Sequence, residues 1–154
     1  NLAQMINVLQ AVILTEGPDM IKTPTYHVMH MYRHHQGADL LSSDLSGVEE
    51  VGLGEWKVPK ITESVSIDKD DVITITLNNL SATDSEDVEV LLVEDGYKVV
   101  EAKIVSHEDM KAHNTFEDPD NVKEVDFTAY EYKNGNLVIS MPPCSVVEVR
   151  IAKE

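Results

Sequence analysis

The feature that most constrains the fold is a change of hydrophobic period at Gly37. Residues 1–36 are apolar and rich in Met and His, whereas apolar and polar residues alternate in short runs after Gly37. Alternation with a period of two places side chains on opposite faces of a strand. The run from Ile73 to Leu77, with Thr at every second position, is typical of a half-buried strand. We therefore predict a mainly β fold for residues 38–154, with a different segment in front of it.

The other alternating runs are predicted to be strands, and turn residues separate them. They cover residues 38–45, 58–67, 88–92, 98–106, 122–133, 137–141 and 144–152. Asn134-Gly135 predicts a two-residue hairpin, because both residues tolerate the positive φ of a type I′ turn. Residues 46–55 and 107–121 are predicted loops, the second with a helical turn at 108–112. About eight strands at this spacing favour an antiparallel β-sandwich.

The opening segment allows two interpretations. Six apolar residues recur at helical spacing, which predicts an amphipathic helix over residues 2–14: Leu2, Met5, Ile6, Leu9, Val12 and Ile13. The run Ala11–Leu14 fits a short buried strand or a loop equally well. Thr23-Pro24 is a strong helix start and Gly37 a plausible left-handed stop, so we predict a second helix over residues 24–36.

Charge and composition exclude several classes of protein. The net charge of −16 comes from 28 Asp and Glu against 12 Lys and Arg, and it repels phosphate backbones and anionic lipid. We therefore expect neither a nucleic-acid nor a membrane partner. The single cysteine, Cys144, rules out a disulfide framework. The chain begins without Met or a basic leader, which is expected of a processed chain, a tag-cleaved chain or an excised fragment.

Two groups of residues suggest metal sites, but neither pattern is complete. His27, His30 and His34 can share one helix face, which a transition metal would need. The segment lacks an HExxH pattern and a Cys or carboxylate at matching spacing, so partly buried or solvated histidines are preferred. Acidic turns around Asp68 and Asp84 lack the twelve-residue calcium loop, and solvated turns are preferred there. We expect no metal and no cofactor.

Three further features have plain structural explanations. A sugar platform could use Trp56, Tyr130 or Tyr132, but aromatic residues make up only 5% of the chain and core or edge packing is preferred. Cys144 is expected to be a small buried hydrophobe. Asn79-Leu80-Ser81 fits the N-glycosylation pattern, which is common by chance.

Three motifs occur in order along the chain. The first is NLAQMINVLQ (residues 1–10), which leads to TPTYHVM (residues 23–29). The second is AHNTFEDPDNV (residues 112–122), and the third is MPPCSVV (residues 141–147). Together they resemble the C-terminal segment of family 51 glycoside hydrolases, the α-L-arabinofuranosidases, over nearly the whole chain. Met29 stands where that family often has Phe, an apolar exchange that a packed site tolerates.

The resemblance implies a (β/α)8 barrel followed by a β-sandwich of jelly-roll type. Residues 1–4 would then end the last barrel strand, residues 5–23 would form the loop after it, and residues 24–36 would be the last barrel helix. The implied domains are a barrel remnant over residues 1–37 and a C-terminal β-sandwich over residues 38–154. Barrel active sites are built from the loops after the strands, so residues 5–23 would lie on the catalytic face.

The resemblance also implies an activity for the whole gene product. The family hydrolyses terminal α-L-arabinofuranosyl residues of arabinan and arabinoxylan oligosaccharides with retention, using two barrel glutamates that would lie upstream of Asn1. This chain is then expected to be structural and non-catalytic. Gln10 matches the family's substrate-contacting Gln, whose amide could bond a sugar hydroxyl. The alternative is a non-catalytic carbohydrate-binding module.

The implied partners are the upstream catalytic barrel of the same polypeptide and an arabinose-containing oligosaccharide. The resemblance favours the cytoplasm. The six apolar residues of the opening segment would be covered by the barrel. Without it, we expect them to pack on the sandwich or to form a homo-oligomer.

Overall fold

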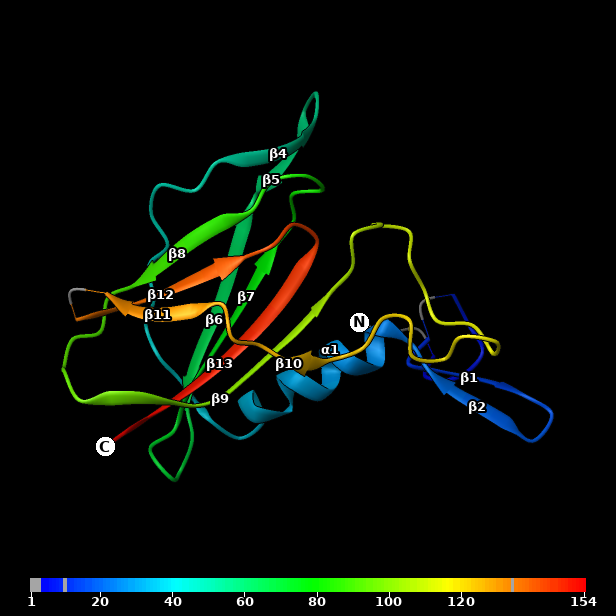
Figure 1. Ribbon diagram of the computed structural model, residues 1–154, viewed down its shortest axis with the longest axis horizontal. Coiled ribbons are helices and arrows are strands. Elements are labelled where there is room, and N and C mark those ends of the chain that lie inside the picture. The colour runs from blue at the N-terminus through cyan, green and yellow to red at the C-terminus, as the bar shows by residue number, and fades with distance from the viewer. Residues whose placement is uncertain (1–3, 10, 134) are drawn as a thin grey trace.

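The computed structural model describes residues 4–9, 11–133 and 135–154. An opening hairpin and one helix precede two antiparallel sheets that face each other (Figure 1). The mainly β antiparallel fold predicted from the alternating runs is confirmed. None of the helices among the described residues has the length and apolar character needed to cross a membrane.

The opening segment is a hairpin followed by a short helix. Strands β1 (Ile13–Glu16) and β2 (Asp19–Lys22) pair antiparallel. Helix α1 (Pro24–Tyr32) begins after Thr23 with Pro at its first position, and the 3₁₀ turn η1 (Arg33–His35) ends it. The helix predicted from Pro24 is confirmed, although its last turn tightens before Gly37, which has a φ of +74°. The helical interpretation of residues 2–14 is wrong for the described part of that stretch, because residues 4–9 and 11–12 form bends, turns and a bridge, and strand β1 begins at Ile13.

The larger sheet has six antiparallel strands in the order β10-β9-β13-β7-β6-β3. Their bounds are β3 (Asp39–Leu40), β6 (Ile61–Ile67), β7 (Ile73–Asn79), β9 (Tyr97–Ser106), β10 (Val125–Asp126) and β13 (Ser145–Lys153). Helix α1 contacts the outer face of this sheet along β9 and β13. Part of the outer face is therefore covered, and the polar side chains of Thr74, Thr76 and Glu148 are buried there.

The smaller sheet has three strands in the order β11-β12-β8. They are β8 (Glu86–Val90), β11 (Tyr130–Lys133) and β12 (Asn136–Met141). A separate hairpin of β4 (Glu50–Leu53) and β5 (Trp56–Pro59) extends from the top of the view in Figure 1. Between β11 and β12 the register pairs Lys133 with Asn136, as a two-residue turn requires.

The core lies between the two sheets and is formed by the alternating residues of the central strands. Strands β7, β12 and β13 contribute side chains that are at most 8% exposed: Ile73, Ile75, Leu77, Leu137, Ile139, Met141, Val147, Val149 and Ile151. Apolar side chains at every second position thus meet across the sandwich, as alternation predicts.

Some predicted boundaries are wrong. The strand expected over residues 38–45 is reduced to Asp39–Leu40, and the loop expected over residues 46–55 contains β4. The strand expected over residues 122–133 is two strands, because the chain crosses between the sheets at Phe127. The helical turn expected at 108–112 is a single turn, closed by the bond from the Ala112 amide to the Asp109 carbonyl.

Candidate functional site

The loop before β1 is held in place by Asn7. Its Nδ2 donates to Thr15 Oγ1 at 2.8 Å, and its Oδ1 accepts from the Thr15 amide at 2.7 Å. The backbone of Asn7 has a φ of +52°, a left-handed conformation that Asn tolerates better than most residues. Gln10, the predicted substrate-binding residue, lies outside the described residues. The contacts of Asn7 anchor the described residues before Gln10 to the hairpin.

Part of the opening segment is covered and part is exposed. Ala11 and Val12 are 1% and 4% exposed, and Thr23 Oγ1 donates to the Ala11 carbonyl at 2.6 Å. Three other apolar side chains are 46–90% exposed: Met5, Ile6 and Leu9. Ile13 is half-buried, and Leu2 lies outside the described residues. Val12 is thus covered, whereas Met5, Ile6 and Leu9 do not pack on the sandwich, and the alternative expectation for them, a homo-oligomer, stays a prediction.

Asn114 links the opening segment to the sandwich. It is 4% exposed, and its Nδ2 donates to the carbonyls of Lys22 at 2.8 Å and Val122 at 2.9 Å. Its Oδ1 accepts from the Val122 amide at 2.7 Å. The two bonds to Val122 satisfy buried backbone groups, and the third satisfies the partly buried carbonyl of Lys22. The sequence motif around Asn114 carried the resemblance, and the side chain proves to be a structural clamp rather than a ligand-binding group.

Three of the helix histidines bind separate partners, whereas the ring nitrogens of the buried His27 have no hydrogen-bond partner among the described residues. His30 Nδ1 lies 2.8 Å from Glu124, and His34 Nδ1 lies 2.7 Å from Glu148. His35 bonds Ser66 and Thr76 through its two ring nitrogens at 2.7 and 2.9 Å. Among the described residues, no three His, Cys, Asp or Glu side chains form a group that could hold a metal. These side chains are therefore partly buried histidines with structural contacts, as the preferred interpretation of the sequence predicts.

Glu148 is a charged group that the sequence did not single out. It is 1% exposed, although it sits on the outward face of β13 in the alternation. Burial raises the pKa of Glu148, and the hydrogen bond from His34 opposes that shift. Its Oε2 has no hydrogen-bond partner among the described residues. Because helix α1 covers this face, a position that alternation assigns to solvent is buried.

The two acidic turns are held by local hydrogen bonds. Asp68 Oδ1 accepts from the amides of Asp70 and Val72 at 2.9 and 3.1 Å. The bond from Val72 is the first cause of the lowered pKa of Asp68. Asp84 accepts from the hydroxyl of Ser81 at 3.1 Å. These contacts agree with solvated turns.

The three candidate sugar-binding aromatics lie apart on different elements. Trp56 is 86% exposed at the tip of the β4–β5 hairpin, opposite Leu53, so the expected core or edge packing is wrong for it. Tyr130 is half-buried against Phe127, and Tyr132 is 45% exposed on β11. The exposed Trp56 is an isolated aromatic surface rather than a platform.

The remaining two candidates are structural. Asn79 is 2% exposed, and its Nδ2 donates to the carbonyls of Asp84 and Pro142 at 2.9 and 3.0 Å, so a glycan cannot be attached to it in the folded chain. Cys144 is half-buried rather than buried and has a φ of +50°. Its Sγ lies 3.6 Å from the Ser81 carbonyl.

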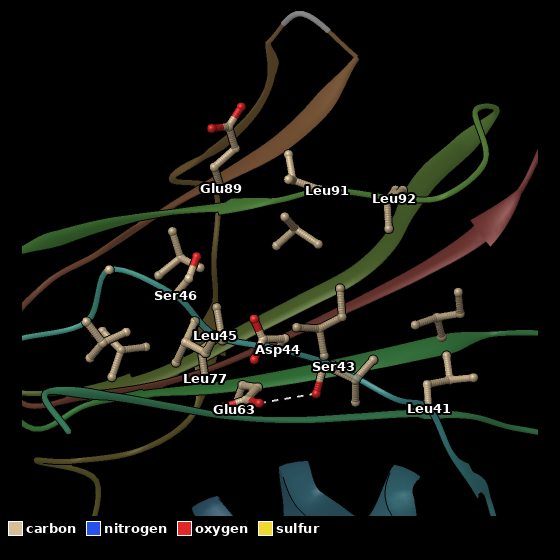
Figure 2. Close-up of a pocket in the computed structure, with 18 of the residues that line it drawn as sticks. Leu41, Ser43, Asp44, Leu45, Ser46, Glu63, Leu77, Glu89, Leu91 and Leu92 are labelled. Carbon is tan, nitrogen blue, oxygen red and sulfur yellow. Dashed lines mark hydrogen bonds between the residues drawn. The ribbon is translucent and has the colours of Figure 1, made fainter. Parts of the chain in front are cut away.

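A groove of about 950 Å³ opens between the two sheets. Figure 2 shows Leu41, Leu45 and Leu77 on its lower side and Leu91 and Leu92 on its upper side. Lys60 lies at its rim, 5% exposed, and binds Glu86 and Glu49. The hydrogen bond to Glu86 is the first cause of the raised pKa of Lys60. The groove is therefore apolar within, and the rim cation is neutralised by its own acids.

Comparisons with known proteins find one family and several relatives. The model of the α-L-arabinofuranosidase C-terminal domain matches residues 1–145. An intracellular exo-α-L-arabinofuranosidase of Bacteroides ovatus is 32% identical over 98% of this chain and 29% of its own length. The GH51 arabinofuranosidase of Xanthomonas axonopodis pv. citri superimposes with a TM-score of 0.90 at 34% identity, over 97% of this chain and 30% of that one.

A more distant structure shares the fold. The α-L-arabinofuranosidase of Thermotoga maritima has a TM-score of 0.78 at 22% identity, covering 99% of this chain and 33% of that one. The chain thus spans about a third or less of the length of the relatives it matches.

Proposed function

The chain belongs to the α-L-arabinofuranosidase C-terminal domain family, and on this premise we propose that its parent polypeptide is an exo-acting, retaining α-L-arabinofuranosidase. The observation that carries the proposal is the match over residues 1–145, together with relatives of which this chain spans only about 30%. The parent would remove terminal α-L-arabinofuranosyl residues from arabinan or arabinoxylan oligosaccharides. This chain supplies the non-catalytic C-terminal part.

The proposed domain division is a barrel remnant over residues 1–37 and a β-sandwich over residues 38–154. The change of period at Gly37 supports it, as does the helix that ends just before that glycine. Asn114 and the pair of His34 and Glu148 tie the remnant to the sandwich. The role proposed for residues 38–154 is to hold the last barrel helix in place.

The reaction requires two carboxylates that this chain does not provide. Retaining glycosidases use an acid/base and a nucleophile about 5 Å apart. Both are expected on barrel strands upstream of Asn1. Without them, binding contacts from one loop cannot lower the barrier. The 154-residue chain alone is therefore expected to be inactive.

Gln10 is proposed to hydrogen-bond an arabinofuranose hydroxyl in the parent. It lies in the sequence between Asn7, which is anchored to β1, and Ala11, which is buried. The side chains of Met5, Ile6 and Leu9 are apolar and exposed, which supports the proposal that the barrel covers them in the parent. Without the barrel, a second copy of the chain is the proposed cover.

The test compares the full gene product with the 154-residue chain on an aryl α-L-arabinofuranoside. The full product should release the aryl group, and the short chain should not exceed a boiled control. Gln10→Ala in the full product should lower kcat/KM by about 10- to 100-fold, the value of one or two hydrogen bonds. Turnover by the short chain, or an inactive full product, would contradict the proposal.

A second function, a carbohydrate-binding module, is favoured by one observation. Trp56 is 86% exposed, and flat aromatic side chains stack on sugar rings. The chain would then be retarded by arabinan in an affinity gel, and Trp56→Ala would abolish the effect.

A further inference from the structure

Thr23 stands where a helix cap is expected, but its side chain does not cap helix α1. It precedes Pro24, the first residue of the helix, and its backbone is extended, with a φ of −90° and a ψ of 168°. A threonine hydroxyl at this position ordinarily accepts a hydrogen bond from an amide of the first helical turn. Among the described residues, which include the whole of that turn, the Thr23 side chain accepts no such bond. Its hydroxyl serves another contact.

The hydroxyl of Thr23 holds the backbone that directly follows Gln10 in the sequence. Thr23 Oγ1 lies 2.6 Å from the carbonyl oxygen of Ala11 and 3.2 Å from that of Val12. The amide of Thr23 also donates to the Val12 carbonyl, at 3.1 Å. Because the main-chain amide already serves Val12, the shorter side-chain contact makes the Ala11 carbonyl the main acceptor of the hydroxyl proton. Ala11 is 1% exposed, so this contact is made at a buried residue.

The sequence explains why a side chain makes this bond. The ladder between β1 and β2 pairs Ile13 with Lys22, and the Thr23 amide extends it by one bond. The next residue is Pro24, which has no N–H and begins the helix, so the main chain cannot continue the ladder. A buried carbonyl without a donor is destabilising. The hydroxyl of Thr23 thus supplies the donor that Pro24 lacks.

Thr23 is itself fixed on both sides. Before it, Asn114 Nδ2 donates to the Lys22 carbonyl at 2.8 Å, which ties the end of the hairpin to the sandwich. After it, the Tyr26 amide donates to the Thr23 carbonyl at 3.0 Å. The ammonium group of Lys22 lies 4.6 Å from the centre of the Tyr26 ring, a cation–π distance that links the hairpin to the helix. The hydroxyl of Thr23 is therefore held in place and can fix its acceptor.

We propose that Thr23 is a positioning residue for Gln10: its hydroxyl fixes the Ala11 carbonyl and, through that residue, the backbone that carries the Gln10 side chain. This inference rests on the proposed function, because it takes Gln10 as the group that bonds an arabinofuranose hydroxyl. A side chain that contacts substrate must be held within about 0.5 Å of its productive position. Asn7 anchors the chain before Gln10, and Thr23 anchors it after. Thr23 acts through Gln10 and does not contact the sugar.

The test is a double-mutant cycle in the full-length protein, assayed on an aryl α-L-arabinofuranoside. Thr23→Val keeps the shape of the side chain and removes the hydroxyl, so kcat/KM should fall about 2- to 10-fold, the range for one hydrogen bond. In the Gln10→Ala background the same substitution should change kcat/KM by less than about 2-fold, because residues that act as a unit are not additive. Thr23→Ser retains the hydroxyl and should restore kcat/KM.

The matched control is Thr25→Val, the same exchange two residues further on in the first turn of α1. Thr25 is partly exposed, and its substitution should leave kcat/KM unchanged in both backgrounds. If Thr23→Val does not give folded protein, Thr23→Ala, which removes the hydroxyl with a smaller side chain, goes through the same cycle.

A purely structural role for Thr23 gives a different result. Partial unfolding lowers the apparent kcat by the same factor in both backgrounds and leaves KM unchanged, since the remaining folded molecules bind substrate normally. Equal factors in the two backgrounds, or wild-type kinetics for Thr23→Val, would overturn the positioning role and leave the proposed function intact. The single variant Gln10→Ala reports on the proposed function. Unchanged kcat/KM in that variant, or an inactive full-length protein, would contradict the substrate contact and would overturn both.

Discussion

Nδ1 of His34 lies 2.7 Å from Oε1 of Glu148, a carboxylate that is 1% exposed beneath the end of helix α1. This contact joins the proposed last barrel helix to the central strand β13. Glu101 and Arg150 lie on the same outer face, and the bond between them is 3.1 Å long. The face between helix and sheet therefore combines these polar contacts with an apolar cluster that includes Met31, Val105 and Val146.

The first prediction concerns pH. Burial raises the pKa of Glu148 above its ordinary value of about 4.5, so the folded chain binds this proton more readily than the unfolded chain. The stabilising contribution of Glu148 should be complete below the ordinary pKa of the unfolded chain. It should be lost as pH rises through the raised pKa of the folded chain. We therefore expect the unfolding free energy of Glu148→Gln, minus that of wild type, to increase as pH rises from 4 to 7. Urea denaturation at each pH measures this difference.

Glu131→Gln, at an exposed position on β11, is the control and should show no such pH dependence. A difference between wild type and Glu148→Gln that changes in the opposite direction would mean that the pairing with His34 outweighs burial.

The second prediction concerns the clamp at Asn114. Asn114→Ala leaves the carbonyl of Lys22 and both backbone groups of Val122 without their partner. Each buried polar group left unsatisfied costs about 1–3 kcal/mol, so a loss of at least about 2 kcal/mol in unfolding free energy is expected. Asn121→Ala, which removes one exposed bond to the His113 carbonyl, should cost less than about 0.5 kcal/mol. Equal losses in urea denaturation would refute the clamp.

Alternation predicted the central strands because each turns one face to the apolar core between the sheets. In β13, Val147, Val149 and Ile151 are fully buried on the inner side, and the same is true of Leu137 and Ile139 in β12. The signal is physical, since a half-buried strand must place apolar side chains at every second position. The central part of the fold could therefore be predicted from the sequence.

The hairpin of β4 and β5 could not be predicted in this way. Its side chains are mostly exposed, so no apolar pattern marks it. Gly52 in β4 has a φ of +137°, and a Cβ there would collide with the carbonyl oxygen of Trp56. Gly52 was predicted to lie in a loop, but the close approach of the two strands requires a glycine at this position.

Hydrophobic periodicity also could not predict the roles of Asn114 and Glu148. Asn114 stands in a loop motif, and the resemblance marked that motif without giving the side chain a function. The burial of Glu148 depends on where helix α1 docks, which is a tertiary contact between residues 114 positions apart. Local sequence carries no signal for such a contact.

The third prediction concerns Trp56. Because it is 86% exposed, Trp56→Ala should change the unfolding free energy by less than about 0.5 kcal/mol. If residues 38–154 have the structural role proposed above, neither wild type nor this variant should be retarded by arabinan in an affinity gel. Retardation of the wild type that the substitution removes would establish the carbohydrate-binding alternative instead.

The fourth prediction concerns Asn7, whose side chain bonds Thr15 twice while its backbone holds a φ of +52°. Asn7→Gly removes the two bonds, but glycine still adopts the positive φ easily. Asn7→Ala removes the same bonds and also costs about 1–2 kcal/mol, because alanine is strained in the left-handed conformation. In the full-length protein, melting temperatures should therefore fall in the order wild type, Gly, Ala.

Thr15→Val isolates the contribution of the side-chain bond, because the Thr15 amide can still donate to Asn7 Oδ1. If the loop positions Gln10 for substrate, kcat/KM on the aryl arabinofuranoside should fall in the order Thr15→Val, Asn7→Gly, Asn7→Ala, with the last the lowest. Loss of melting temperature without any change in kcat/KM would leave Asn7 a purely structural residue and would separate the loop from substrate binding.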